Sequence, residues 1–397
     1  MSDASFDPAA LAGLEAVAGK ARAVFAGAGY QPVQPPIIQP ADIFLDRYGE
    51  EIRGRIFVLS DPSGAELCLR PDLTIPTCRA WLEAGGLRGA PARLSYYGPA
   101  FRYQPRASGR PSEFRQTGIE CFGLPDTEAA DAEVMLTAIA ACRAAGLAEA
   151  DYELGDLGLF EALIDTIEVP AQWRPRLKRQ FWRPGYFSSL IERLAGADGG
   201  AERGAPGGSA EGPAFLTALG TLGEAEARAV IHDILALAEI APVGGRSIDE
   251  IAERFLEQAA DASALTISRE AVMLIDRFLK IRARPDEALE AIAALVTTAG
   301  PAMRAALDRA GRRLDLLVKG GFPLERAVFA TAFGRGVEYY TGFVFEIHGP
   351  GEAGRALAGG GRYDSLLTEL GAPARVPAVG CAIRLERLAA ALAGRAS

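Results

Sequence analysis

The sequence predicts an α+β protein: a mainly antiparallel sheet of about six or seven strands, flanked by helices, with a helical insertion. Residues 93–123 support this, because their second half alternates between polar and apolar side chains as a strand does. Residues 214–319 carry helical patterning almost throughout. Strand-like sequence then returns at 327–332, 342–348 and 376–381, so the helical block interrupts a sheet.

These observations divide the chain into three parts. Residues 1–123 form the first part of the core, 124–320 a mainly helical insertion, and 321–397 the second part of the core. Inside the insertion, residues 196–212 are rich in Gly, Ala and Ser, which predicts a mobile loop.

The first part of the core begins with an amphipathic helix at 7–28, where Asp7 and Pro8 supply a cap and a first-turn residue. Residues 30–40 contain four prolines, which favours an edge strand. A short helix at 42–48 precedes a hairpin of 56–59 and 66–70, joined by an Asp-Pro-Ser-Gly turn. A helix follows at 73–85, with Asp72 in the position of an N-cap.

After residue 123 the pattern predicts a helix at 127–146, a strand at 152–157 and a helix at 160–167. Residues 172–194 are basic and aromatic, which fits either a packed helix with extended Arg and Lys side chains or a nucleic-acid surface. The chain closes with a strand at 376–381 and a helix at 383–393.

Composition excludes several classes of function. The net charge of −9 argues against binding of nucleic acid over a broad, positively charged surface. Five scattered cysteines without a CxxC pair predict buried thiols in a reducing cytoplasm, and two histidines make a histidine-based metal or catalytic site implausible. The N-terminus lacks a signal peptide pattern, and no apolar stretch is long enough to span a membrane.

The hairpin at 93–123 allows two interpretations. One of its faces carries the polar side chains Arg102, Gln104, Gln116 and Glu120. This face is either solvated, as in many antiparallel sheets, or the floor of a site for a small zwitterion. In the second case Glu120 and Gln116 would accept hydrogen bonds from an ammonium group, and Arg102 would bind a carboxylate or phosphate.

Four segments in the same order resemble one family. The stretch RLSYYGPAFRYQPRASGRPSEFRQTGIECFG (93–123) resembles motif 2 of class II aminoacyl-tRNA synthetases in its histidyl form. LCLRPDLT (67–74) and GRGVEYYTGFVFEIHG (334–349) resemble the substrate loop and the histidine-specific loop of histidyl-tRNA synthetases. AGGGRYDSLLTELG with VPAVGCAIRLERL (358–388) resembles their glycine-rich strand and motif 3. The resemblance therefore implies a class II synthetase-like fold.

The resemblance also implies a histidine site, carried over residue by residue. The matching positions are Asp72, Thr74, Arg102, Gln116, Glu120, Arg335, Tyr340 and Tyr363. Asp72 stands where the family usually has Glu. The helix at 7–28 and the strand around Pro36 have the layout of motif 1, which in the family is a homodimer interface. The resemblance implies no metal and no cofactor.

The residues at positions that bind ATP in the family depart from the family pattern. The motif 3 glycine before Leu-Glu-Arg is replaced by Arg384, which would fill nucleotide space if it pointed into the pocket. Arg387 matches the phosphate-binding arginine, whereas Gln104 replaces a motif 2 glutamate. The sequence ends soon after Arg387, so we expect no anticodon-binding domain. A histidine site without ATP-binding and anticodon-binding elements resembles the regulatory subunits of ATP phosphoribosyltransferase. The sequence Arg-Pro-Asp at residues 70–72 also resembles theirs.

That resemblance implies a cytoplasmic, non-catalytic subunit of the first enzyme of L-histidine biosynthesis. It would activate the short-form catalytic subunit in a hetero-oligomer, expected to be a hetero-octamer, and mediate feedback inhibition by L-histidine. The alternative is a truncated histidyl-tRNA synthetase or a histidine-activating enzyme, which Arg102, Arg335 and Arg387 would favour. A tRNA-binding module that uses residues 174–183 is a third and weaker hypothesis, and tRNA is not an expected partner.

Overall fold

The computed structural model describes residues 8–45, 53–88, 91–105, 108, 111–169, 173–174, 177–178, 187, 191, 229–230, 234, 267–297, 300–334, 339–350 and 355–393. The predicted loop at 196–212, most of the basic segment at 172–194 and Arg335 lie outside these residues. Contacts divide the chain into one unit of Met1–Ile167, Leu177–Trp182 and Leu274–Ser397 and a second of Glu168–Arg176 and Arg183–Met273. Every strand belongs to the first unit.

The main sheet contains nine strands, more than the six or seven that the sequence predicts. In spatial order they are β1 (Gln31–Val33), β5 (Ala92–Phe101), β6 (Glu113–Phe122), β12 (Ala378–Arg384), β11 (Ala358–Arg362), β10 (Phe343–His348), β7 (Asp151–Asp156), β9 (Ala327–Ala330) and β8 (Arg282–Ala283). The β1–β5 and β7–β9 pairs are parallel and the other pairs antiparallel, so the sheet is mainly antiparallel as predicted.

The predicted strand count was too low because the edges of the sheet are made of very short pieces. Strands β1 and β8 have three and two residues, which is too short for an alternating pattern to be visible. The predicted single strand at 30–40 was also wrong. Pro35 and Pro36 separate β1 from β2 (Ile38–Pro40), which belongs to a second, three-stranded sheet ordered β2-β4-β3.

The hairpin of this second sheet confirms the prediction from its turn sequence. Strands β3 (Phe57–Ser60) and β4 (Glu66–Leu69) pair antiparallel. Asp61 Oδ1 accepts hydrogen bonds from the backbone N–H groups of Ser63 and Ala65 at 2.8 and 2.9 Å, and Gly64 has a φ of +87° that favours glycine.

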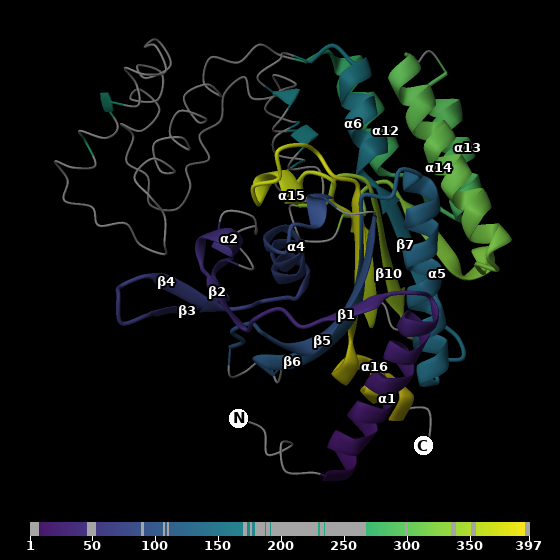
Figure 1. Ribbon diagram of the computed structural model, residues 1–397. Helices are drawn as coiled ribbons and strands as arrows, with labels where there is room; N and C mark the ends of the chain where they lie inside the picture. Colours follow the sequence, from purple (N-terminus) through teal and green to yellow (C-terminus); the bar gives the residue numbers. More distant parts are fainter. Residues whose placement is uncertain are drawn as a thin grey trace. The chain divides into compact units, whose positions relative to one another are not determined.

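Helices cover both faces of the main sheet (Figure 1). They are α1 (Pro8–Gly27), α2 (Asp42–Leu45), α4 (Thr74–Glu83), α5 (Thr127–Ala145), α6 (Leu157–Thr166), α12 (Arg269–Leu279), α13 (Pro285–Leu295), α14 (Pro301–Lys319), α15 (Leu366–Glu369) and α16 (Leu385–Ala393), with short 3₁₀ turns η2 (Gly86–Arg88) and η4 (Leu324–Arg326). Helices α5, α6, α13 and α14 lie on one side of the sheet, and α4 and α15 lie on the other (Figure 1).

Local sequence explains where these helices start. Pro8 opens α1 as predicted, and the Asp126 side chain caps α5 by accepting the Ala129 N–H at 3.1 Å.

Within the described part of the chain, no helix combines the length and hydropathy that crossing a membrane requires.

Candidate ligand-binding site

A polar cavity of about 200 Å³ lies on the face of the main sheet that α4 covers. Six of the eight side chains that the sequence predicts for a histidine site line it, namely Asp72, Thr74, Arg102, Gln116, Tyr340 and Tyr363. A seventh, Glu120, lies beneath the cavity and accepts a hydrogen bond from the Tyr363 hydroxyl. Arg335 lies outside the described residues. The structure thus brings together residues that are nearly 300 positions apart in sequence.

The floor of the cavity is the polar face of the β5–β6 hairpin. Gln116 and Glu120 alternate along β6 and are 3% and 0% exposed. The solvated-face interpretation is therefore wrong for this part of the hairpin, because other strands and α4 cover it. Gln104, which was predicted on the same face, is not among the residues that line the cavity.

Glycines in the neighbouring strands make room for these side chains. A Cβ atom at Gly380 in β12 would lie 1.5 Å from Glu120 Oε2, which no side chain can tolerate. A Cβ atom at Gly361 in β11 would lie 2.9 Å from the Tyr340 ring. Glycines at these positions therefore let neighbouring side chains approach the strands closely.

The acidic end of the cavity holds more hydrogen-bonding capacity than the protein itself uses. Among the described residues, Glu120 Oε1, Gln116 Oε1 and the Tyr96 hydroxyl are buried without a hydrogen-bond partner. Burial raises the pKa of Glu120 to about 8, although its hydrogen bond with Tyr363 opposes this shift. Since leaving such groups unpaired costs about 1–3 kcal/mol each, the site is arranged for a donor from outside the chain.

Asp72 combines two roles that the sequence presented as alternatives. The N-cap of α4 is Leu73, one position after the predicted Asp72, but Asp72 Oδ1 still accepts the Ile75 N–H in the first turn at 3.3 Å. The same side chain lines the cavity. Burial raises the pKa of Asp72 to about 6 against the opposing charge of Arg102, whose Nε donates to the Pro71 carbonyl at 2.8 Å.

Three arginines also line the cavity, namely Arg102, Arg384 and Arg387. Strand β12 was predicted to end at Cys381 but continues to Arg384, which lies opposite Gln116. The Arg384 guanidinium stands 4.3 Å from the centre of the Phe114 ring, and Arg102 stands 5.8 Å from the same ring. Arg384 lines the cavity, which meets the condition under which it would occupy nucleotide space.

Some residues of the site escaped prediction. Tyr339, Glu346 and Cys381 also line the cavity. Tyr339 could have been found from its neighbour Tyr340, since both rings pack against Tyr363. Cys381 and Glu346 gave no signal, because a thiol in an apolar strand and a charge in an alternating strand are ordinary.

Arg70 was also missed as a structural support of the site. It is 2% exposed, and its guanidinium donates to the carbonyls of Pro35, Pro36 and Pro99. These bonds hold the proline-rich segment against β5, two residues before Asp72. All five cysteines are buried thiols that form no disulfide bond, as predicted. In the part of the chain that the structure describes, no group of His, Cys, Asp and Glu side chains could hold a metal ion.

The arrangement suits a small zwitterion. The buried acceptors of Glu120 and Gln116 face a donor-rich group, and Asp72 offers a second carboxylate. The arginines of the cavity suit a carboxylate, which a guanidinium binds through two parallel hydrogen bonds. The cavity is smaller than the about 300–1,000 Å³ typical of drug-sized ligands, which limits the ligand to roughly an amino acid.

Known proteins resemble this chain over nearly its whole length. Residues 4–186 and 229–388 match the family model described as histidyl-tRNA synthetase. The ATP phosphoribosyltransferase regulatory subunit of Rhizobium meliloti is 37% identical over 97% of this chain and 99% of its own length. That of Brucella anthropi is 36% identical over 90% of this chain and 92% of its own.

The chain belongs to the ATP phosphoribosyltransferase regulatory subunit family. This family shares the histidyl-tRNA synthetase domain that the sequence motifs indicated. Solved structures agree on the fold. An ATP phosphoribosyltransferase regulatory subunit/histidyl-tRNA synthetase from Bacillus halodurans superposes with a TM-score of 0.69 at 23% identity, covering 99% of this chain and 82% of that one. A histidine–tRNA ligase subunit from Alicyclobacillus acidocaldarius gives 0.62 at 25% identity, with 100% and 97% covered. The predicted class II synthetase-like fold is confirmed.

Proposed function

We propose that this chain is the non-catalytic regulatory subunit of ATP phosphoribosyltransferase, the first enzyme of L-histidine biosynthesis, and that it senses L-histidine in the cavity described above. It would join the short-form catalytic subunit in the cytoplasm, raise its turnover, and transmit feedback inhibition when histidine binds. The regulatory role follows from relatives of this name that align over 90% or more of the chain.

The observation that supports sensing without catalysis is the position of Arg384. An adenylating enzyme needs a flat, open surface for the adenine ring beside its amino-acid pocket. In this chain the Arg384 guanidinium lies 4.3 Å from the centre of the Phe114 ring, and Arg384 lines the cavity. The amino-acid end remains open, with unpaired acceptors on Gln116 and Glu120. Such a pocket would bind histidine, and the Arg384 guanidinium would compete with a stacked nucleotide for the face of the Phe114 ring.

Assembly with the catalytic subunit tests the main proposal. The short-form catalytic subunit should co-purify with this chain, turn over faster in its presence, and lose that gain when histidine is added. Binding and inhibition must be linked reciprocally, so histidine affinity should differ between the free chain and the complex by about 5- to 150-fold. A catalytic subunit that neither binds this chain nor changes its rate would contradict the proposal.

Histidine binding is tested separately on the isolated chain. Calorimetry should show one site per chain, and Tyr363→Phe should weaken binding by about tenfold because it removes the donor to Glu120. A matched control is Tyr103→Phe, since Tyr103 is 49% exposed and does not line the cavity. Equal effects of the two substitutions would mean that histidine binds elsewhere.

The alternative, an enzyme that activates histidine, rests on Arg102 and Arg387, which both line the cavity. It makes a different prediction. Such an enzyme would exchange labelled pyrophosphate into ATP in the presence of histidine, whereas a sensor would not. Measurable exchange by the wild-type chain would overturn the non-catalytic assignment.

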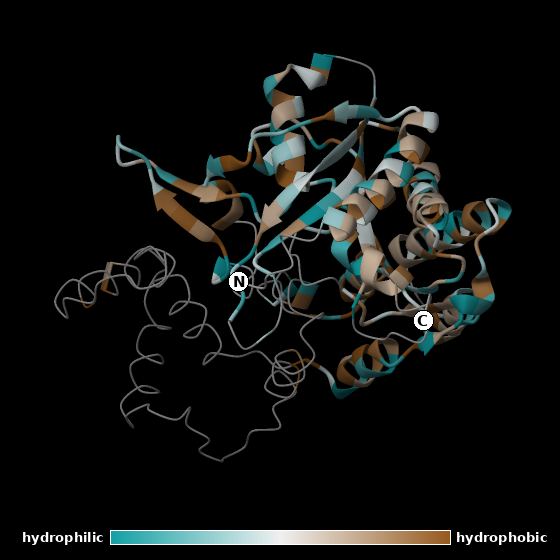
Figure 2. Ribbon diagram, turned by 90° about the horizontal axis from the view of Figure 1, so that it is seen from below, coloured by the Kyte–Doolittle hydropathy of each residue, from teal (hydrophilic) through white to brown (hydrophobic). Residues whose placement is uncertain are grey.

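We also propose that two copies pair through the motif 1 region, within a hetero-octamer. Leu11 of α1 is 48% exposed, and the neighbouring Ile37 and Ile38 beyond the prolines are 40% and 52% exposed. The adjoining three-stranded sheet also carries hydrophobic residues along its strands (Figure 2). Ile38→Asp should yield monomers in analytical ultracentrifugation, whereas Val318→Asp on α14, where the side chain is 44% exposed, should not.

A further inference from the structure

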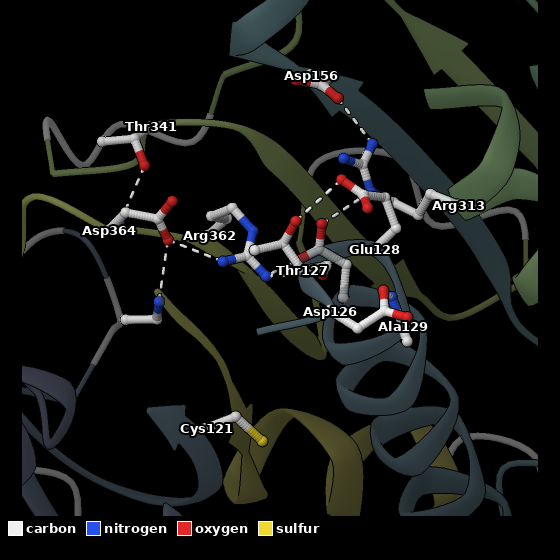
Figure 3. A network of polar contacts seen from close by, with 12 residues as sticks. Cys121, Asp126, Thr127, Glu128, Ala129, Asp156, Arg313, Thr341, Arg362 and Asp364 are labelled. Atoms are coloured by element: carbon white, nitrogen blue, oxygen red, sulfur yellow. Dashed lines mark hydrogen bonds and ion pairs between the residues drawn. The ribbon is translucent and has the colours of Figure 1, made fainter. Parts of the chain in front are cut away.

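A buried charged network lies on the opposite side of strand β11 from the cavity. It consists of Asp131 on α5, Asp156 at the start of α6, Arg313 on α14, and Arg362 and Asp364 at the end of β11, and Figure 3 shows it. Asp131, Asp156, Arg313 and Arg362 are 0%, 7%, 6% and 6% exposed. The sequence analysis gave none of these residues a role.

Each carboxylate of this network accepts a short hydrogen bond from a guanidinium group. Arg313 donates from Nε to Asp131 at 2.8 Å and from Nη1 to Asp156 at 2.7 Å. Arg362 donates from Nη2 to the other oxygen of Asp131 at 2.6 Å. Asp131 therefore bridges two guanidinium groups, and α14 is joined to β11 through α5.

The same network fixes both neighbours of Tyr363. Arg362, on one side, is held by Asp131 and by the Thr127 carbonyl at 2.8 Å. Asp364, on the other side, accepts from Arg362 at 2.8 Å and from the Ala378 N–H at 2.9 Å. Because side chains alternate along a strand, Arg362 points toward α5 while Tyr363 lines the cavity.

The network also reaches the second tyrosine of the cavity. Thr341 Oγ1 accepts the backbone N–H of Asp364 at 3.0 Å, and the Thr341 N–H donates to the Arg362 carbonyl at 2.8 Å. Thr341 directly follows Tyr340. Tyr340 and Tyr363, two of the three tyrosines that line the cavity, are thus attached to backbone that the buried charges hold in place.

We infer that the network of Asp131, Asp156, Arg313, Arg362 and Asp364 is the positioning element of the cavity, setting the place of Tyr363 and Tyr340 for the ligand. This inference rests on the proposed histidine site and adds the residues that control it. Arg313 and Arg362 touch no ligand and act through the tyrosines. Since α14 ends one side of the network, a change in tyrosine position is transmitted to that helix.

Two adjacent arginines of α14 supply a matched test. Arg313 is buried in the network, whereas Arg312 pairs at the surface with Asp126 and Glu128 and its side chain is 50% exposed. The substitutions Arg313→Gln and Arg312→Gln remove the same charge from the same turn. Calorimetry should show about 3- to 30-fold weaker histidine binding for Arg313→Gln and no more than about twofold for Arg312→Gln.

A milder variant covers the case in which Arg313→Gln fails to fold. Thr341→Val keeps the shape of the side chain and removes the oxygen that accepts the Asp364 N–H. It should weaken histidine binding by about threefold, with a lower melting temperature of the unliganded chain because the Asp364 N–H loses its acceptor, but with the fold retained. Unchanged affinity for Thr341→Val would overturn the role of the Tyr340 side of the network.

A double-mutant cycle distinguishes positioning from general destabilisation. If Arg313 acts through Tyr363, the Arg313→Gln effect on affinity should largely vanish in a Tyr363→Phe background. Additive losses, or equal losses for Arg312→Gln and Arg313→Gln, would overturn the inference. Failure of the wild-type chain to bind histidine would instead refute the proposed sensing function, so the two failures are told apart.

Discussion

The two sides of strand β11 bury polar groups in opposite ways. On the α5 side, each carboxylate of the network contacts a guanidinium at 2.6–2.8 Å. On the α4 side, Glu120 and Gln116 each keep a buried oxygen without a partner among the described residues. The first side pairs each of its carboxylates with a guanidinium, whereas the second keeps carbonyl and carboxylate oxygens without a partner.

This difference shows which polar residues are structural and which are functional. A paired buried charge stabilises the fold only while its partner is present, and breaking one pair costs about 3–5 kcal/mol. An unpaired buried acceptor lowers stability until a ligand arrives. Removing charge should therefore have opposite effects on the free energy of unfolding on the two sides of the strand.

The largest effect should come from closing the cavity. Gly380→Ala places a methyl group where Glu120 Oε2 now lies, so the carboxylate must leave its position. We expect histidine affinity, measured by calorimetry, to fall by about 100-fold or more, as displacements near 1 Å do at precise sites.

Gly311→Ala in α14 is the control for this substitution. No atom lies within 4 Å of a Cβ at Gly311, and alanine favours a helix. This variant should bind histidine normally and unfold at a slightly higher temperature. A Gly380→Ala chain that binds histidine as well as wild type would mean that Glu120 does not contact the ligand.

Removing one charge from each side tests the contrast directly. Asp131→Asn leaves Arg313 and Arg362 without their shared anion, and should lower the free energy of unfolding by about 3 kcal/mol. Glu120→Gln should raise it by a few kcal/mol at pH 8, at about 1.4 kcal/mol per pKa unit, because an ionised Glu120 is costly to bury. Urea titration of the unliganded chains measures both, and a loss in both variants would contradict the comparison.

The pH dependence of the unliganded chain follows from the same carboxyl group. Glu120 has a pKa near 8 when folded, against 4.5 for an ordinary glutamate, so the folded state binds the extra proton between these values. Its contribution to stability is present below about pH 4.5 and is lost as the pH rises toward 8. Asp72, with a pKa of about 6, adds a smaller loss over a lower range.

Ligand binding should then release a proton at pH 7. A cationic group beside Glu120 favours its ionised form, so up to about one proton should leave on binding. Calorimetry in buffers of different ionisation enthalpy measures this number directly. Glu120→Gln should abolish the release, and a wild-type value of zero would indicate that Glu120 is already ionised.

The sequence predicted the cavity better than it predicted the sheet. The cavity residues belong to motifs with distinctive sequences. Of the eight residues predicted for the histidine site, six line the cavity and Glu120 lies beneath it. Edge strands of two or three residues carry no periodicity, and the split at Pro35 and Pro36 depends on which sheet each half joins. Neither is visible in a local pattern.

The charged network could not have been predicted from the sequence. Asp131 and Arg313 read as ordinary helix-surface residues, because Asp and Arg are common on exposed faces. Their burial depends on α5 and α14 meeting beside β11, which only the tertiary fold determines. Arg384 was different, because a charged residue at a position where the family has glycine could be identified from the sequence. Only the direction of its side chain had to come from the structure.

The smallest effect should come from reopening the space that Arg384 occupies. Arg384→Gly removes the guanidinium from the Phe114 ring and, with it, about 0.5–1 kcal/mol of cation–π contact. The exposed ring should then stack with an adenine base, so equilibrium dialysis should detect ATP binding that the wild-type chain lacks. Arg384→Lys is the control, since it keeps a cation in the same strand position. Equal ATP binding by wild type, Arg384→Lys and Arg384→Gly would mean that Arg384 does not separate this chain from enzymes that use ATP.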